Sequence, residues 1–397
     1  MKRNNPASRL SPSRLIASIS RTLLGLVFIF SGAVKAIDPL GTVYKIEDYL
    51  KAFGGFFTEL LPLAEVAAWG LIILELLLGV CMLLNIRTQW TSWLALLFYL
   101  VMTPLTLYIA LTNPVSDCGC FGDAIVLTNW QTFWKNVVLI TLAILLVVLR
   151  KHTRQLWSNW MEVVLATLTI MAAIAFMTWT RLHLPIKDFR PYKIGNHLPT
   201  LMEYPEDAEH DQYDISFVYE KDGVEQTFTL ENYPKDDSTW TFVRQDSRLI
   251  KKGYEPPIHD LEILNADYED LTWDILESEK PITLVVMYDL AKADKKQMAK
   301  VEALASNLSP FASSPDRLIT SSSDTLPLEG ELEGAFYILT GSGTDDIINF
   351  CLAYPTLSDY ICTCDPVTLK TIVRANPGVI VLQNGTVIDK YNLRNHD

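Results

Sequence analysis

Long apolar runs fill the first half of the chain, and short runs with turn residues between them fill the second half. A membrane helix needs about 20 apolar residues, because the bilayer core holds no water to satisfy backbone groups outside a helix. Five segments have this character: residues 15–34, 63–84, 93–112, 133–149 and 161–179. The pattern predicts a bundle of membrane helices followed by a different kind of domain.

The second half shows the periods of a mixed α/β structure. Residues 214–230 alternate apolar and polar positions on both sides of Asp222-Gly223, as a β-hairpin does. Residues 281–288 and 334–340 are apolar throughout, which is typical of buried central strands, and residues 292–308 follow the period of a helix. The pattern predicts a β-rich segment and then an α/β domain.

Residues 41–53, between the first two spans, predict an amphipathic helix, because their apolar positions recur at helical spacing opposite charged ones. Two placements are open for this helix. It lies in the membrane interface, or it packs on top of the bundle.

Charge divides the chain at the same place as hydropathy. The net charge is −13 over 397 residues, yet basic residues outnumber acidic ones up to about residue 177, so the acidic excess belongs to the second half. A domain this acidic repels phosphate backbones, which argues against nucleic acid as a partner.

Basic residues also indicate the orientation in the membrane. They flank alternate span ends, at Lys2, Arg3, Arg9, Arg14, Arg87, Arg150, Lys151 and Arg154, and tryptophans mark the span ends at Trp90, Trp130, Trp134, Trp160 and Trp179. Basic loops stay in the cytoplasm, and interfacial tryptophans contact lipid headgroups. We therefore expect a cytoplasmic N-terminus and a C-terminal domain on the outer side.

Four of the six cysteines form two close pairs, Cys118/Cys120 and Cys362/Cys364, whereas Cys81 and Cys351 lie in apolar runs and are predicted to be small buried residues. On the oxidising side thiols form disulfides. A Cys-Gly-Cys pair closes only with local strain, part of which Gly119 relieves, and strained disulfides exchange readily. We expect Cys118 and Cys120 to be a redox dithiol, and the alternative is a buried or separately bonded pair.

The surroundings of this pair limit its chemistry. Asp117 and Asp123 flank it, and carboxylates disfavour a thiolate, which argues against a strongly acidic thiol. No metal site is expected, because the loop has no histidine and two cysteines are too few ligands for zinc.

Glu75 lies near the middle of the second span, where an unpaired carboxylate is costly, so it should face the bundle interior. Lys35, at the end of the first span, is its candidate partner. Glu75 is then an intramembrane acid in a proton relay, a contact for a quinone, or a buried polar tie between helices.

Three motifs resemble the MauE/DoxX family of redox-associated membrane proteins. They are the stretch from Arg21 through Ser31-Gly32 and Lys35 to Asp38-Pro39, the string Glu75-Leu-Leu-Leu-Gly79, and the string Asp117-Cys-Gly-Cys-Phe-Gly122 followed by Asn129-Trp130. The likeness covers about residues 15–150. It implies a four-helix membrane fold associated with disulfide formation and electron transfer at the outer face of the bacterial inner membrane, with accessory or maturation roles such as those of the methylamine utilisation branch.

The C-terminal part resembles TlpA-like thioredoxin folds. Residues 253–263 resemble the first strand of that fold, and residues 376–391 form a hairpin preceded by Pro377, at the place of its cis-proline. Where the family carries Cys-x-x-Cys, residues 288–294 contain no cysteine, so the resemblance implies a degenerate domain used for docking. Cys362 and Cys364 are then a second dithiol, a structural disulfide or two inert thiols, and a structural or inert role is favoured.

These observations predict a membrane helical bundle with a fifth span, a β-rich insertion and a thioredoxin-like α/β domain. The domains are residues 1–152, 153–185, 186–253 and 254–397. The leading functional hypothesis is a redox-associated accessory protein of the inner membrane that acts on a periplasmic client or redox partner. The alternative is a non-enzymatic assembly or maturation factor whose degenerate domain binds a partner protein.

Overall fold

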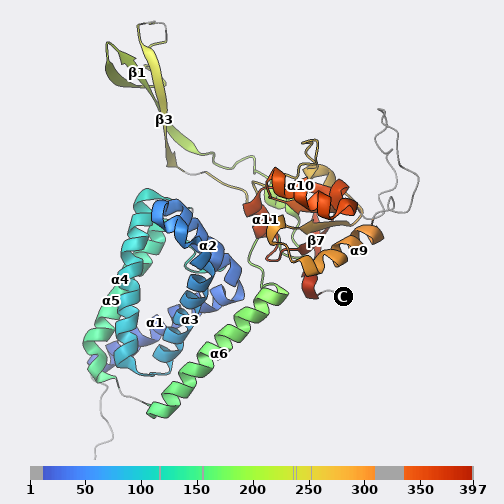
Figure 1. Ribbon diagram of the computed structural model, residues 1–397. Coiled ribbons are helices and arrows are strands. Elements are labelled where there is room, and N and C mark those ends of the chain that lie inside the picture. The colour runs from blue at the N-terminus through green and yellow to red at the C-terminus, as the bar shows by residue number, and fades with distance from the viewer. Residues whose placement is uncertain are drawn as a thin grey trace, which may run out of the picture.

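The computed structural model describes residues 12–115, 118–153, 156–235, 237, 239–251, 253–308 and 335–395. Long helices form one end of the molecule, a mixed sheet covered by short helices forms the other, and a narrow three-stranded arm projects from the region between them (Figure 1).

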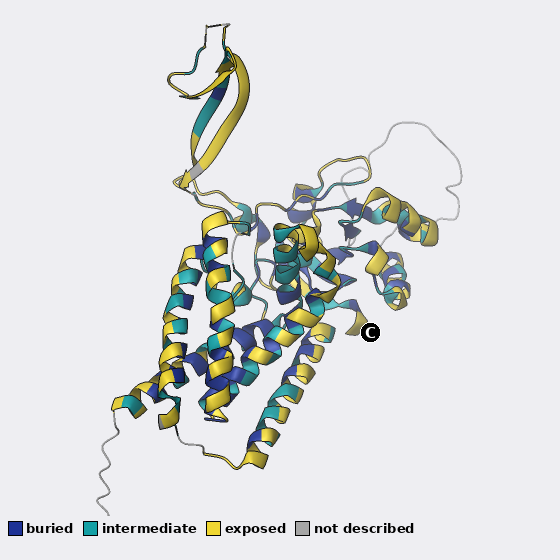
Figure 2. Cartoon of the chain, turned by 60° about the vertical axis from the view of Figure 1, so that its left-hand side comes forward, coloured by how far each residue is buried: buried dark blue, intermediate teal, exposed yellow. Residues whose placement is uncertain are grey.

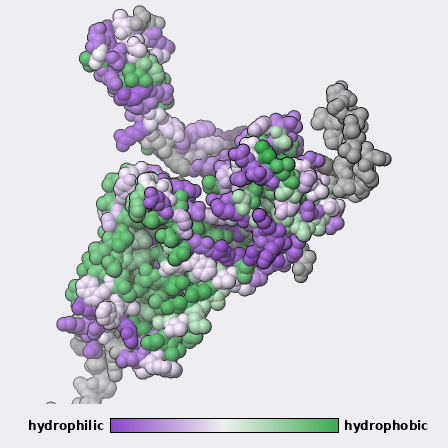
Figure 3. All heavy atoms as spheres, in the orientation of Figure 1, coloured by the Kyte–Doolittle hydropathy of each residue, from purple (hydrophilic) through white to green (hydrophobic). Residues whose placement is uncertain are grey.

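All five predicted spans are helices that are long and apolar enough to cross a membrane. They are α1 (Pro12–Ile37), α3 (Ala64–Leu83), α4 (Thr88–Thr112), α5 (Asn129–Leu149) and α6 (Asn159–His183). The surface of these helices is largely apolar in Figure 3, in contrast to the polar surface of the C-terminal half. All five tryptophans predicted at the span ends are exposed, as side chains facing lipid headgroups are.

The bundle is built on a close contact between α1 and α3. A Cβ atom added to Gly79 would lie 2.7 Å from the backbone nitrogen of Ile29, and one added to Gly32 would lie 3.0 Å from that of Leu76. Glycine therefore permits the two backbones to approach, as small residues do in membrane helix pairs. α5 packs on the other side of α1, α4 packs on α5, and α6 packs on α3.

The predicted amphipathic helix is α2 (Pro39–Phe53). Asp38 caps it by accepting a hydrogen bond from the backbone N–H of Gly41. Its apolar face, which includes Val43, packs with Ala64 and Ala68 at the start of α3. These contacts favour packing on the bundle. A 3₁₀ helix, η1 (Gly55–Leu63), joins α2 to α3.

The predicted hairpin is part of the arm, which consists of β1 (Gln212–Lys221), β2 (Val224–Thr229) and β3 (Thr241–Lys251). The strand order is β2-β1-β3, and the turn falls at Asp222-Gly223 as predicted. Val218 is the one buried side chain among the described residues of the arm, and most of the others are exposed (Figure 2).

The C-terminal sheet contains β4 (Ile282–Val286), β5 (Phe336–Thr340), β6 (Ile361–Thr363), β7 (Gly378–Gln383) and β8 (Thr386–Asn392). Its order is β6-β5-β4-β7-β8, in which β4, β5 and β6 are parallel and β7 and β8 are antiparallel to their neighbours. Both predicted central strands are therefore present, and the hairpin turn falls at Asn384-Gly385.

Short helices cover both faces of this sheet. α9 (Met298–Leu308) and α10 (Thr344–Ala353) contribute to one apolar cluster, and α7 (Leu198–Met202), α8 (Thr272–Leu276) and α11 (Pro366–Ile372) contribute to the other. Residues 186–202 also belong to this body, because Leu198 donates a backbone hydrogen bond to Gly385 at 2.7 Å. Strands of the predicted β-rich segment begin at Gln212.

Two local predictions in this domain were wrong. Residues 253–263 form no strand, because Pro256 and Pro257 lack backbone donors and the Ile258 N–H bonds to Leu201 instead. The helix predicted over residues 292–308 begins at Met298, because the Asp294 side chain accepts from the Lys296 N–H and holds a separate 3₁₀ turn. The Asn376-Pro377 peptide bond is cis, as the resemblance implied.

Candidate functional site

Cys118 and Cys120 lie in the loop between α4 and α5, called here the cysteine loop. Gly119 and Gly122 both have positive φ, at 63° and 52°, and the Gly122 N–H donates to the Gly119 carbonyl at 3.0 Å. Glycine is the residue that adopts this backbone without strain. The loop therefore turns back on itself at the position where the sequence places Gly119.

Two helices hold the cysteine backbone. The Ser31 hydroxyl of α1 donates to the Cys120 carbonyl at 2.8 Å, and the Tyr49 hydroxyl of α2 donates to the Cys118 carbonyl at 2.8 Å. The two Sγ atoms lie 2.6 Å apart, and both side chains are half-buried. A sulfur–sulfur bond is about 2.05 Å long. The two sulfur atoms therefore lie only about 0.5 Å beyond the length of a disulfide bond.

Glu75 and Lys35 form the buried ion pair that the sequence predicted. Lys35 Nζ lies 2.7 Å and 2.8 Å from the two carboxylate oxygens of Glu75, and the two residues are 5% and 3% exposed. Lys35 also donates to the Ser31 hydroxyl at 2.7 Å. A continuous set of hydrogen bonds thus runs from the intramembrane acid through Lys35 and Ser31 to the backbone of Cys120.

The two thiols differ in acidity. The hydrogen bond from the Cys118 thiol lowers the pKa of Cys120 to about 6, and the charges of Lys135 and Lys35 act in the same direction against the opposing effect of burial. The pKa of Cys118 is raised, because its thiol is the donor of that hydrogen bond and because it is buried. These shifts favour a thiolate on Cys120 over one on Cys118.

The expectation that flanking carboxylates would disfavour a thiolate was wrong for Cys120. Asp123 faces Arg374, at 3.5 Å, and burial raises its own pKa. The charges that act most strongly on Cys120 are instead the ammonium groups of Lys135 and Lys35. Asp117 lies outside the described residues.

A cavity of about 330 Å³ lies within the bundle beside the cysteine loop. α1, α2, α3, α4 and α5 all contribute to its walls, and Cys118, Cys120, Lys35 and Glu75 all line it. The structure thus brings the predicted dithiol and the predicted intramembrane acid to one apolar cavity, although they are distant in the sequence.

Three polar residues of this cavity were missed by the sequence analysis: Tyr99, Lys135 and Asn136. Lys135 Nζ lies 4.3 Å from the ring centroid of Phe121 in the cysteine loop. The signal that identifies Lys135 is the same one that identified Glu75, because a charged residue within an apolar span faces the protein interior.

A second cluster joins the C-terminal domain to the cysteine loop. Arg374 is 8% exposed, and it bonds to Asp38 at 2.9 Å and to Asp123 at 3.5 Å. Burial alone would raise the pKa of Asp38, but the charges of Arg374 and Arg190, together with the hydrogen bonds from Gly41 and Arg374, outweigh it and lower the pKa below the usual range. Beside them, the Tyr288 hydroxyl lies 3.2 Å from that of Tyr44 on α2.

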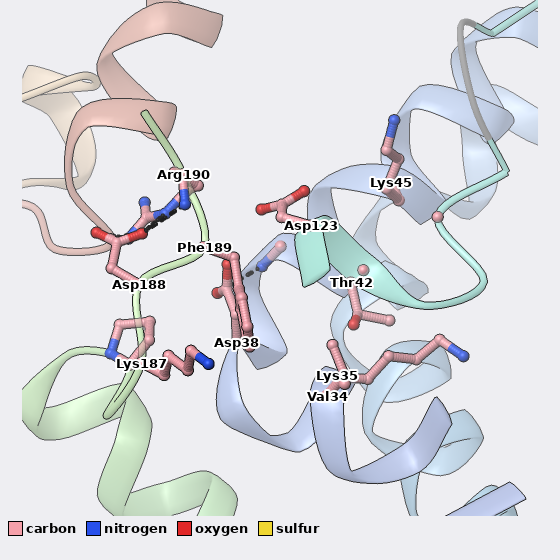
Figure 4. Close-up of a pocket in the computed structure, with 14 residues that line it drawn as sticks. Val34, Lys35, Asp38, Thr42, Lys45, Asp123, Lys187, Asp188, Phe189 and Arg190 are labelled. Carbon is pink, nitrogen blue, oxygen red and sulfur yellow. Dashed lines mark hydrogen bonds and ion pairs between the residues drawn. The ribbon is translucent and has the colours of Figure 1, made fainter. Parts of the chain in front are cut away.

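Figure 4 shows a small pocket at this junction, where residues 187–190 run beside α1 and α2. Asp188 and Arg190 pair with each other there, whereas the Lys35 side chain extends away from Asp38. The junction is therefore a charged contact separate from the Lys35–Glu75 pair.

The remaining cysteines lie elsewhere. Cys81 is buried in α3, and Cys351 is half-buried, so it is more accessible than predicted. Cys362 and Cys364 are both buried free thiols in one apolar cluster of the C-terminal domain, and burial raises the pKa of Cys362 to about 11 and of Cys364 to about 12. These surroundings favour the inert alternative for that pair. Among the described residues, no three His, Cys, Asp or Glu side chains gather as a metal site would require.

Comparison with protein families finds a match in the helical part. Residues 13–149 match the family model of methylamine utilisation protein MauE. This MauE-like region contains α1 to α5 and the whole of the cysteine loop. A second model, described as a domain of unknown function (DUF8463), matches residues 213–252, which form the arm. No curated protein and no solved structure matches the chain.

Proposed function

We propose that this chain is a membrane thiol–disulfide redox protein in which Cys118 and Cys120 alternate between a dithiol and a disulfide. The observation that carries the proposal is the distance of 2.6 Å between their Sγ atoms in a loop that two helices hold. The acidity of Cys120 supports it, because a thiol of low pKa is a good leaving group in disulfide exchange.

The exchange proceeds in two balanced steps. A thiolate of the client attacks Cys118 Sγ of the oxidised pair, and Cys120 leaves as a thiolate beside Lys135 and Lys35. A second client thiolate then attacks the client sulfur of the mixed disulfide and releases Cys118, which takes up a proton. The client gains one disulfide, and the pair gains two electrons and one proton, with Cys120 left as a thiolate.

The sidedness of the reaction is part of the proposal. Arg87 and Arg150 lie in the connections at the opposite ends of α4 and α5 from the cysteine loop. With basic loops in the cytoplasm, the cysteine loop and the C-terminal domain face the outside of the bacterial inner membrane, the periplasm, where disulfides persist.

The C-terminal domain acts in this proposal as a docking domain with a thioredoxin-like core. Support comes from the order β5-β4-β7-β8, a parallel pair flanked by an antiparallel hairpin, which the resemblance to that fold leads one to expect. Tyr288, at the place where the family carries its redox cysteines, instead contacts Tyr44 of α2. The domain is therefore anchored beside the cysteine loop without thiol chemistry of its own.

One observation favours a second function, that of an assembly or maturation factor. The arm exposes both faces of β1, β2 and β3 and carries exposed aromatic side chains such as Phe242 and Tyr213. An exposed sheet with apolar groups is a surface that a partner protein can cover. On this alternative the arm recruits the client, and the name of the matched family leads us to consider a client that takes part in methylamine utilisation.

One experiment separates the two functions. The oxidised, purified full-length protein is mixed with a reduced dithiol peptide, and the peptide disulfide formed is counted by mass spectrometry. We expect one disulfide per protein from the wild type and none from the variant Cys118→Ala/Cys120→Ala. A variant with residues 212–251 replaced by a Gly-Ser linker should match the wild type, because the base of the arm is closed by the 2.8 Å bond from Tyr254 N–H to the Glu209 carbonyl. Equal yields from the wild type and the double alanine variant would refute the redox function and leave the assembly function.

A further inference from the structure

The cavity beside the cysteine loop has a distinct polar end and apolar walls. Phe28, Leu71, Phe98, Met102 and Leu139 are among the residues that form the walls, and they come from α1, α3, α4 and α5. A volume of about 330 Å³ is at the lower end of the range of roughly 300–1,000 Å³ that small-molecule sites occupy. The cavity therefore suits a compact, largely apolar molecule.

The polar end carries hydrogen-bond donors and the redox pair together. Lys35, Tyr99, Lys135, Cys118 and Cys120 all line the cavity. Lys35 is positioned firmly, because both carboxylate oxygens of Glu75 and the hydroxyl of Ser31 accept from its ammonium group. A lipid acyl chain has no acceptor for these donors. A flat carbonyl compound has acceptors, and its ring matches the aromatic walls.

We propose that this cavity binds the head group of a lipid-soluble quinone, which reoxidises Cys118 and Cys120. The inference rests on the proposed function, because it supplies the oxidant that the disulfide needs after each exchange. The thiol of Cys118 and the thiolate of Cys120 together lose two electrons and one proton and form one S–S bond. The quinone gains these two electrons, that proton and a second proton from water, and leaves as a quinol, so the step is balanced.

Residues of the polar end have separate roles in this step. Cys120 provides the thiolate, Lys135 is the donor toward a quinone oxygen, and the positive charge of Lys35 stabilises negative charge as it develops there. Glu75 holds Lys35 in place and is a positioning residue. Its location on the same set of hydrogen bonds allows the ion pair to return a proton to the reduced oxygen.

The test fills the cavity without touching the polar end. Ala67 of α3 lines the cavity and is exposed, whereas Val66, its neighbour, is 70% exposed and does not line it. Ala67→Trp should occupy the space of the ring, and Val66→Trp places the same side chain elsewhere on the helix and serves as the matched control. The full-length proteins are reduced in nanodiscs of quinone-free lipid and mixed with decylubiquinone without oxygen.

Quinol is followed by ultraviolet absorbance, and the cysteines are counted by alkylation. We expect one quinol and one disulfide per wild-type protein, and the rate for Ala67→Trp should fall at least about tenfold while Val66→Trp stays within about twofold. A wild type that exchanges disulfides with glutathione but forms no quinol would overturn this inference and leave the proposed function intact. An Ala67→Trp variant as fast as the wild type would also overturn it, whereas a wild type inactive toward both probes would refute the proposed function itself.

Discussion

Replacing Lys35 with methionine should destabilise the bundle by about 3–5 kcal/mol, because the carboxylate of Glu75 is then left buried without its partner. The double variant Lys35→Met/Glu75→Met should recover most of this loss, since it removes both charges and fills a similar volume. The measurement is the thermal midpoint of the purified proteins, followed by size-exclusion chromatography after heating.

Lys51→Met is the matched control for this series, because Lys51 is exposed on α2. Its replacement should leave the free energy of unfolding within about 1 kcal/mol of the wild-type value. A single variant as stable as Lys51→Met would mean that the ion pair contributes nothing to the bundle. A double variant as unstable as the single one would instead place the effect in packing around Lys35.

Alkylation of Cys120 should stay fast down to about pH 6 and slow below it, because the pKa of this thiol is lowered to about 6 and the thiolate is the reactive form. The direction of the pKa shift follows from the hydrogen bond that Cys118 donates to Cys120. Cys118 stabilises the charged form of Cys120, so loss of that hydrogen bond raises the pKa and shifts the midpoint to higher pH. At a pH below the pKa, each unit of upward shift lowers the thiolate population by about tenfold.

Two variants that differ in one oxygen atom test this cause. Cys118→Ser retains a hydroxyl donor toward Cys120, whereas Cys118→Ala retains none. We expect the pH midpoint of alkylation to stay low in the serine variant and to rise by at least about one unit in the alanine variant. A midpoint that stays low in both variants would show that the lysines alone set the acidity of Cys120.

The sequence was sufficient to predict the spans and the first half of the site. A bilayer imposes a minimum apolar length, so each of the five helices left a signal in the sequence, and the structure extends their ends. Lys35 and Glu75 were paired correctly because a charged side chain within a membrane span faces the bundle interior and pairs with an opposite charge there. Gly119 was recognised because few other residues adopt its backbone angle.

The rest depends on contacts that no local pattern reveals. Asp38 and Arg374 are 336 positions apart, and nothing near either residue indicates its partner. The acidity of Cys120 was misjudged for the same reason, since the sequence places Asp117 and Asp123 beside it while folding brings Lys135 and Lys35 near. The cavity is likewise invisible to sequence periodicity, because its walls come from five different helices.

The most direct test of the redox function is the state of the Cys118/Cys120 pair in living cells. The protein keeps this pair, while Cys81, Cys351, Cys362 and Cys364 are replaced by alanine. Cells are quenched with acid, and free thiols are then tagged under denaturing conditions with a maleimide polymer that shifts the band on a gel. We predict an untagged, oxidised form in growing cells that becomes doubly tagged after dithiothreitol and returns when the reductant is removed. A band that is doubly tagged under all conditions, including after treatment with diamide, would contradict the account.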